Sequence, residues 1–174
     1  MRYAVIYQSK SGNTKQVANE IYASIDSVEK EIVDIDRMGS FPEADVYFVG
    51  FGIHDSNCGM DIIDILEQTS NAKCAVFVTC GYVPTDGYKE KLEKNIEVWI
   101  PDGTEYLGMF VCQGKVKEDR QNIMISKMPG AEEKLKQMFT MGSCHPDAED
   151  LQNASNFAIK IQNKAEKNGE IPIW

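Results

Sequence analysis

A chain of 174 residues, 43% hydrophobic and 26% charged, is long enough to bury one core, and we expect a single domain over residues 1–174. Its formal net charge of −9 argues against a broad basic face for nucleic acid or anionic lipid, and it permits steering toward a basic partner. No run of roughly 18 apolar residues predicts a membrane span, and the first residues do not resemble a signal peptide, so we expect a cytoplasmic protein.

The first predicted element is a strand over residues 2–8, where apolar side chains are nearly continuous. A helix is expected directly after it, because one helical face carries Val17, Ala18, Ile21, Tyr22 and Ile25. Residues 29–36 alternate weakly between apolar and polar side chains, which predicts a second strand at the edge of a sheet.

Three further apolar runs, at residues 45–52, 74–81 and 106–114, predict buried strands. Helical patterns at residues 62–66 and 88–100 separate them. Residues 115–144 indicate one or two helices broken at Pro129 and Gly130, and a long amphipathic helix begins near Pro146 with Asp147 as its cap. Strands that alternate with helices predict an α/β fold, in which helices cover both faces of a parallel sheet.

Cysteine and histidine usage favours neither a disulfide framework nor a zinc site. The five cysteines are an odd number without a C-x-x-C pair, and the two histidines, His54 and His145, lie far apart in the sequence. Cys74 and Cys112 fall within strand-like runs, so we expect them to be small buried residues.

Small polar residues join the first predicted strand to the first predicted helix. The segment reads Ser9, Lys10, Ser11, Gly12, Asn13 and Thr14. A helix N-terminus offers unpaired backbone N–H groups and a positive dipole end, and small residues let an anion approach them. The segment therefore predicts a phosphate site at the carboxyl end of the first strand, the alternative being an ordinary helix cap. The P-loop motif and the G-x-G-x-x-G motif are both absent.

Residues 9–14 match the phosphate signature S/T-x-S/T-G-x-T that flavodoxins carry after their first strand. Together with the chain length and the five predicted strands, this motif makes the chain resemble the flavodoxin family, in particular a small flavodoxin-like subgroup. The resemblance implies a doubly wound, five-stranded parallel sheet of order 2-1-3-4-5, with FMN bound where the strand order reverses; flavodoxin is itself a standard example of this arrangement.

By the same resemblance, two loops hold the flavin ring. The first contributes Gly52, Ile53, His54 and Gly59, and the second contributes Thr79, Cys80, Gly81, Tyr82, Asp86 and Tyr88. Tyr82 is the first candidate to stack on the ring, with Tyr88 next; the alternatives are a half-exposed loop residue and a helix-start packing residue.

The first loop departs from the family pattern. Many members place an aromatic residue there, where this chain has Gly52, Ile53 and His54, so either these residues cover the ring or that face is open to a substrate. His54 is a candidate pH-sensitive group, or otherwise a polar loop residue. Gly59 is a candidate for the peptide that flips when a flavodoxin is reduced, the alternative being a plain turn before a helix.

The resemblance implies an FMN-binding electron-transfer protein that shuttles electrons between a reductase and a partner enzyme, and we expect a carrier rather than a stand-alone enzyme because the cofactor carries the chemistry. Asp55, Asp61 and Asp86 are expected near the ring, where they would lower its potential and attract redox partners with basic docking faces. No nucleic acid or membrane partner is expected.

Two alternatives stay open. The first is an FMN-dependent reductase that acts directly on a small molecule, such as a quinone or a tetrapyrrole-like compound. The second is a flavin-free binding module with the flavodoxin fold, which the complete phosphate motif disfavours.

Overall fold

A computed structural model describes residues 1–167. Five parallel strands form one sheet in the order β2-β1-β3-β4-β5. The strands are β1 (Tyr3–Tyr7), β2 (Lys30–Asp34), β3 (Val46–Gly52), β4 (Lys73–Cys80) and β5 (Glu105–Gln113). The predicted fold class and strand order are both confirmed, and the order reverses between β1 and β3.

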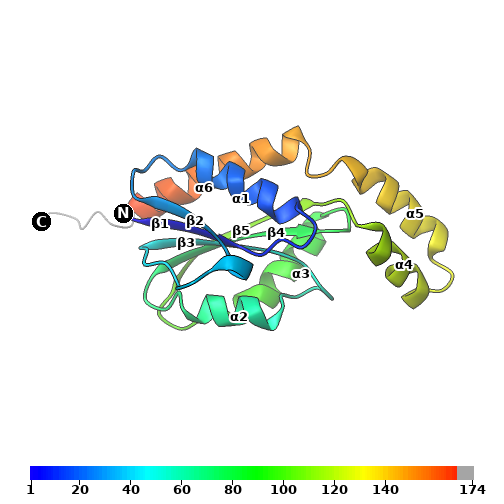
Figure 1. Cartoon of the computed structure of the whole chain (residues 1–174), viewed down its shortest axis with the longest axis horizontal. Coiled ribbons are helices and arrows are strands. Elements are labelled where there is room, and N and C mark those ends of the chain that lie inside the picture. The colour runs from blue at the N-terminus through cyan, green and yellow to red at the C-terminus, as the bar shows by residue number, and fades with distance from the viewer. Residues whose placement is uncertain (168–174) are drawn as a thin grey trace, which may run out of the picture.

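Helices cover both faces of the sheet, as Figure 1 shows. One face carries α1 (Asn13–Ser24) and α6 (Ala148–Lys167), and the other carries α2 (Met60–Glu67) and α3 (Asp86–Glu97). Successive residues of a strand point to opposite faces, so Val5 packs in the core beneath α1 and α6, while Ile6 packs in the core beneath α2 and α3. This double coverage is why β1, β3 and β4 are apolar and buried along nearly their whole length.

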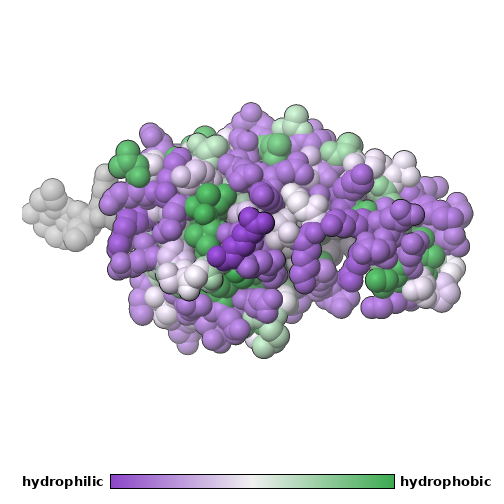
Figure 2. All heavy atoms as spheres, in the orientation of Figure 1, coloured by the Kyte–Doolittle hydropathy of each residue, from purple (hydrophilic) through white to green (hydrophobic). Residues whose placement is uncertain are grey.

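Residues 115–144 form a helical hairpin rather than part of either layer. Its helices are α4 (Glu118–Lys127) and α5 (Glu132–Met141), separated at Pro129 and Gly130 as the sequence predicts. The hairpin extends past the carboxyl ends of the strands in Figure 1, and α4 buries none of its residues. Hydrophilic side chains dominate the face in Figure 2, where a small apolar patch lies over the hairpin. Within residues 1–167, no helix combines the length and apolar character that crossing a bilayer requires.

The start of α6 confirms the predicted cap. The Asp147 carboxylate accepts hydrogen bonds from the backbone N–H groups of Glu149 and Asp150, at 2.9 and 3.0 Å. The Asp150 carboxylate accepts one in return from the Asp147 N–H at 2.9 Å. These reciprocal bonds satisfy N–H groups that the helix itself leaves unpaired.

Candidate functional site

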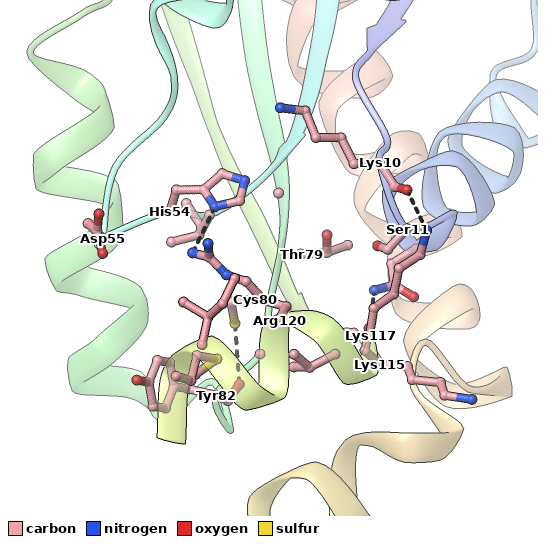
Figure 3. Close-up of a pocket in the computed structure, with 18 of the residues that line it drawn as sticks. Lys10, Ser11, His54, Asp55, Thr79, Cys80, Tyr82, Lys115, Lys117 and Arg120 are labelled. Atoms are coloured by element: carbon pink, nitrogen blue, oxygen red, sulfur yellow. Dashed lines mark hydrogen bonds between the residues drawn. The ribbon is translucent and has the colours of Figure 1, made fainter. Parts of the chain in front are cut away.

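A cleft of about 840 Å³ opens at the carboxyl ends of the strands, next to the point where the strand order reverses. This is the edge where open α/β sheets bind ligands, and the volume suits a small organic molecule. Its walls come from the loops that follow β1, β3, β4 and β5 and from the inner side of α4 (Figure 3).

Most of the predicted site residues meet in this cleft, because the carboxyl ends of parallel strands share one edge of the sheet. Those that line it are Lys10, Ser11, Asn13, Thr14, Gly52, Ile53, His54, Thr79, Cys80, Gly81, Tyr82 and Tyr88. Four predicted residues do not line it: Ser9, Gly12, Gly59 and Asp86.

The N-terminus of α1 carries donors without protein partners. Gly12 precedes the helix with a φ of 92°, a backbone conformation that glycine adopts at no steric cost. The Ser9 hydroxyl accepts hydrogen bonds from the N–H groups of Gly12 and Lys15, at 3.1 and 3.2 Å, so Ser9 caps the helix instead of facing the cleft. Among the described residues, the N–H groups of Ser11, Asn13 and Thr14 donate to no protein acceptor. They are available to an anion at the positive end of the helix dipole.

Two polar side chains of this segment tie it to the sheet. Asn13 Nδ2 donates to the Lys115 carbonyl oxygen at 2.9 Å, and the hydroxyls of Thr14 and Thr79 lie 2.9 Å apart in a buried pair. The first contact joins α1 to the chain after β5, and the second joins α1 to the end of β4. In this structure, Asn13 and Thr14 therefore position the backbone donors, and Ser11 is the hydroxyl left exposed at the cleft.

The loop after β3 contains a tight two-residue turn. His54 and Asn57 exchange backbone hydrogen bonds of 3.0 and 2.9 Å, and the residues between them, Asp55 and Ser56, have φ values of 51° and 61°. Glycine or asparagine is usual at such positions, so this turn is strained.

Two side chains of the α3 region hold that turn. Asn95 Nδ2 donates to the Ser56 carbonyl oxygen at 2.8 Å, and Trp99 Nε1 donates to Asn57 Oδ1 at 3.0 Å. Sequence reasoning missed both positioning residues, because neither belongs to a motif and each lies about forty residues from its partner, with separations of 39 and 42.

Gly59 has the plainer of its two expected roles. It precedes α2 with an ordinary φ of −78°, and its carbonyl oxygen accepts the N–H groups of Ile62 and Ile63 at 3.1 and 3.2 Å. In this structure that carbonyl starts the helix, and the peptide flip on reduction stays a prediction. Asp86 likewise lies outside the cleft, fully exposed at the start of α3 with Lys89 4.0 Å away.

The loop after β4 places Tyr82 at the mouth of the cleft. Tyr82 is 40% exposed as a residue, and its ring contacts the ring of Tyr88 edge to face at a centroid separation of 6.0 Å. Its hydroxyl lies 3.9 Å from the Met128 sulfur just past α4. An aromatic face is therefore accessible where the resemblance predicts flavin stacking. Behind it, burial raises the pKa of the Cys80 thiol to about 12, so Cys80 is a neutral, unreactive wall residue.

The wall formed by α4 is the part of the site that the sequence did not reveal. Arg120 Nη2 lies 3.2 Å from His54 Nδ1, and Lys117 Nζ donates to the Lys10 carbonyl oxygen at 3.0 Å. Both contacts are visible in Figure 3, and they bring α4 against the loops after β1 and β3. Burial, together with the charges of Arg120 and Lys10, lowers the pKa of His54, so its imidazole is neutral at pH 7.

The charge of the cleft is opposite to that of the whole chain. Five basic residues line it (Lys10, Lys115, Lys117, Arg120 and Lys127), against the two acidic residues Asp55 and Asp119. Of the three carboxylates expected near a flavin, only Asp55 lines the cleft. Asp61 accepts a hydrogen bond from Nε2 of Gln8, which itself lines the cleft, and Asp86 is fully exposed to solvent. A protein of net charge −9 thus presents a basic cleft.

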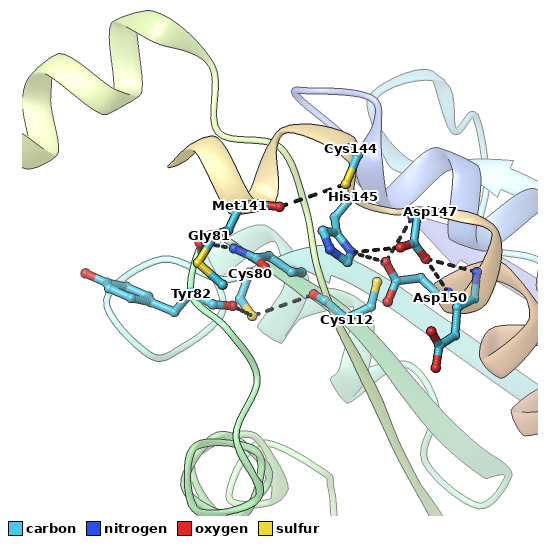
Figure 4. Close-up of polar contacts among 11 residues, drawn as sticks. Cys80, Gly81, Tyr82, Cys112, Met141, Cys144, His145, Asp147 and Asp150 are labelled. Carbon is cyan, nitrogen blue, oxygen red and sulfur yellow. Dashed lines mark hydrogen bonds and ion pairs between the residues drawn. The ribbon is translucent and has the colours of Figure 1, made fainter. Parts of the chain in front are cut away.

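The base of the hairpin is anchored by a second polar cluster, drawn in Figure 4. His145 Nδ1 lies 2.5 Å from Asp150 Oδ2 and 3.8 Å from Asp147 Oδ2, and the His145 carbonyl oxygen accepts the Lys115 N–H at 2.8 Å. Ligand atoms of Cys144, His145 and Asp147 lie within 4.8 Å of one another. Because both carboxylates already serve the cap of α6 and the imidazole, the cluster fixes the chain between α5 and α6, outside the cleft.

Comparison with known proteins agrees with this architecture. A profile of the flavodoxin domain matches residues 4–159. The chain is 32% identical over 174 residues to the flavodoxin-like domain-containing protein BilS of Clostridioides difficile (strain CD3), covering 95% of this chain and 98% of that protein. A protein of the same name from Clostridium symbiosum (strain WAL-14163) is 23% identical over 182 residues, covering 91% and 95%.

A solved structure of oxidised flavodoxin 2 from Bacillus cereus superposes with a TM-score of 0.56 at 21% identity, covering 94% of this chain and 99% of that one. At this identity the superposition speaks for the fold alone, and it agrees with the strand order seen here. With the domain profile and the relative at 32% identity, it leads to one conclusion: the chain belongs to the flavodoxin family.

Proposed function

We propose that this protein binds FMN in the cleft and carries electrons between a reductase and a partner enzyme. The observation that carries the proposal is the set of unpartnered N–H groups at Ser11, Asn13 and Thr14, located at the carboxyl edge of the sheet beside the switch point. Membership of the flavodoxin family supports FMN as the cofactor.

The donors and walls of the cleft fit this cofactor. The N–H groups of Ser11, Asn13 and Thr14 suit a phosphate, and Lys10 and Lys117 add positive charge beside them. The apolar and aromatic residues Ile53, Tyr82 and Tyr88 line the part of the cleft between the loops after β3 and β4, which suits a flat ring. Bound FMN supplies the redox chemistry, and the protein supplies binding, orientation and electrostatics.

Carriage of electrons needs no acid–base catalyst from the protein, because the cofactor carries the chemistry. The basic residues that line the cleft are four lysines and one arginine, which bind anions, and the Cys80 thiol is protonated because burial raises its pKa. Burial lowers the pKa of His54, so its neutral imidazole can accept a proton, which is a property that a direct reductase would use.

A direct reductase of a small molecule is the second candidate, because α4 adds the side chains of Ile123 and Met124, and Met128 directly follows it, along the cleft. Such apolar and adaptable side chains suit an organic substrate beside the ring. In that case the substrate enters between α4 and Tyr82.

The two candidates differ in how they take up electrons. The FMN-loaded protein is mixed with NADH or NADPH, alone and then with a catalytic amount of a flavodoxin reductase, while the flavin band near 450 nm is followed. A carrier is bleached only when the reductase is present, whereas a stand-alone reductase is bleached by the nicotinamide directly and turns over with a quinone. Direct, rapid bleaching would overturn the carrier proposal.

A further inference from the structure

We propose that the redox partner docks through carboxylates onto a basic rim around the cleft, formed by Lys10, Lys117, Arg120 and Lys127. The inference rests on the proposed function, because it takes the cleft as the flavin site. The net charge of the chain led us to expect a partner with a basic docking face. For the surface around the cleft, through which electrons pass, we propose a partner with an acidic docking face instead.

The four rim charges are not neutralised within the protein. Among residues 1–167, none of the four forms an ion pair with a carboxylate. Lys117 donates to a backbone carbonyl oxygen, and Arg120 contacts an imidazole that is neutral at pH 7. With the FMN phosphate bound beside Lys10 and Lys117, the charges of Arg120 and Lys127 are left to act on whatever approaches the cleft, against the two acidic residues Asp55 and Asp119 that also line it.

Because electrostatic interactions in salt solution are short-ranged, the charge of the rim, rather than the net charge of the chain, determines the charge of the partner surface that can dock there. At physiological ionic strength the Debye length is about 8 Å, so charges on the far faces of the molecule are largely screened. With a basic cleft in a chain of net charge −9, the remaining surface must be more acidic than the average. A partner close to the cleft senses the positive rim.

One bound phosphate cannot account for all four cations. Lys117 directly precedes α4 and Lys127 is its last residue. At about 1.5 Å per residue, their backbones therefore lie roughly 15 Å apart along the helix axis. In Figure 3, Lys117 lies beside Ser11 at the N-terminus of α1, whereas Arg120 points to His54 on the opposite loop. The rim thus follows the whole length of the cleft, including the part away from the phosphate site.

The surface inside the rim has the apolar character of a docking site. Tyr82, Ile123 and Met128 line the cleft and are exposed by 40%, 44% and 43%, and the hydroxyl of Tyr82 contacts Met128. Protein interfaces combine an apolar centre with a polar rim, and aromatic residues and methionine are enriched in them. The chemistry recognised is an apolar centre surrounded by aspartate or glutamate side chains.

Two small oxidants of opposite charge test the sign of the potential at the cleft. The FMN-loaded protein is reduced by two electrons and mixed in a stopped-flow instrument with ferricyanide, a trianion, or hexaamminecobalt(III), a trication. Two ferricyanide ions, or two hexaamminecobalt(III) ions, each accept one electron from one reduced flavin, which returns to its oxidised form. The flavin releases to solvent one proton if its reduced form is anionic and two if it is neutral. The rates are followed from low to high salt.

The proposal predicts that the ferricyanide rate falls as salt rises and that the hexaamminecobalt(III) rate increases. At low salt, Arg120→Gln and Lys127→Gln should each lower the ferricyanide rate several-fold, and Lys134→Gln should leave it unchanged. Lys134 is the matched control, because it is an exposed lysine of α5 that does not line the cleft.

The opposite salt dependence, with ferricyanide accelerated by salt, would show that the net charge governs access and would overturn the basic-rim proposal while leaving FMN binding intact. Equal rates in Lys127→Gln, Arg120→Gln and wild type at low salt would overturn it too. A protein that retains no FMN would instead refute the proposed function, and the rim inference with it.

Discussion

Replacement of Gly114 by alanine tests how closely the end of β5 approaches the phosphate segment. Gly114 is buried directly after β5, and a Cβ atom there would lie 2.5 Å from Asn13 Nδ2 and 2.8 Å from Asn13 Cγ. These separations are far inside van der Waals contact, and the Asn13 side chain must move. Its 2.9 Å hydrogen bond to the Lys115 carbonyl oxygen is then lost.

The expected cost follows from these two effects. Overpacking costs about 1–3 kcal/mol where the neighbour cannot move, and a lost neutral hydrogen bond costs about 1 kcal/mol. Because the half-buried Asn13 side chain can rotate away, we expect Gly114→Ala to lower the free energy of unfolding by about 1–2 kcal/mol. FMN affinity should fall too, by about tenfold for each 1.4 kcal/mol of binding energy lost, because Asn13 holds the N-terminus of α1 in place.

Urea unfolding of the apoprotein, followed by circular dichroism, measures the first effect, and an FMN titration measures the second. Gly87→Ala is the matched control: Gly87 lies in α3, nothing lies within 4 Å of its added Cβ, and alanine should stabilise the helix by about 0.5–1 kcal/mol. An unchanged urea midpoint for Gly114→Ala would refute the close approach on which this reasoning depends.

Three further predictions concern single groups. Thr14→Val should lower the free energy of unfolding by about 1–3 kcal/mol, because it leaves the buried Thr79 hydroxyl without its 2.9 Å partner; Thr14→Val/Thr79→Val should recover part of this loss in the same urea assay. Burial and the charges of Arg120 and Lys10 lower the pKa of His54 from its usual value of about 6.5. Below about pH 6.5 the unfolded chain therefore binds more protons at this residue than the folded chain does, so the free energy of unfolding falls as the pH falls. NMR titration should show His54 titrating below that value and moving upward in Arg120→Gln, and no movement would refute the coupling. Ellman's reagent should react rapidly with the exposed Cys144 and slowly with the buried Cys80 and Cys112, whose pKa values burial raises; Cys144→Ser should abolish the fast phase, and a persistent fast phase would contradict this assignment.

The fold was predictable because its signals are local and repeated. Four of the five strands are short apolar runs, and β2 alternates between apolar and polar side chains. Each helix that covers the sheet has one apolar face, and the parallel topology brings the polar loops after the strands to one edge. The same logic is enough to predict, from the sequence, that Ser11, Ile53, Thr79 and Tyr82 share one cleft.

The rest of the site depends on tertiary placement, for which the sequence carries no pattern. Helix α4 buries no residue, so its sequence gives no sign that Arg120 reaches His54. The net charge of the chain does not reveal the basic cleft, because it sums the charges of all faces of the molecule. Ser9 and Gly59 lie in loops, and only the folded chain shows that the Ser9 hydroxyl accepts the Gly12 N–H and that the Gly59 carbonyl oxygen accepts the N–H groups of the first turn of α2.

The most direct test of the central claim is an FMN titration of wild type, Ser11→Glu and Asn19→Glu, followed by quenching of flavin fluorescence. Ser11 lies at the unpartnered N–H groups, whereas Asn19 is an exposed residue of α1 away from the cleft, so the two variants add the same charge at different places. We predict one FMN bound per wild-type chain, affinity about tenfold or more weaker in Ser11→Glu from repulsion of the phosphate, and unchanged affinity in Asn19→Glu. No quenching by wild type, or equal affinity in Ser11→Glu, would contradict the account.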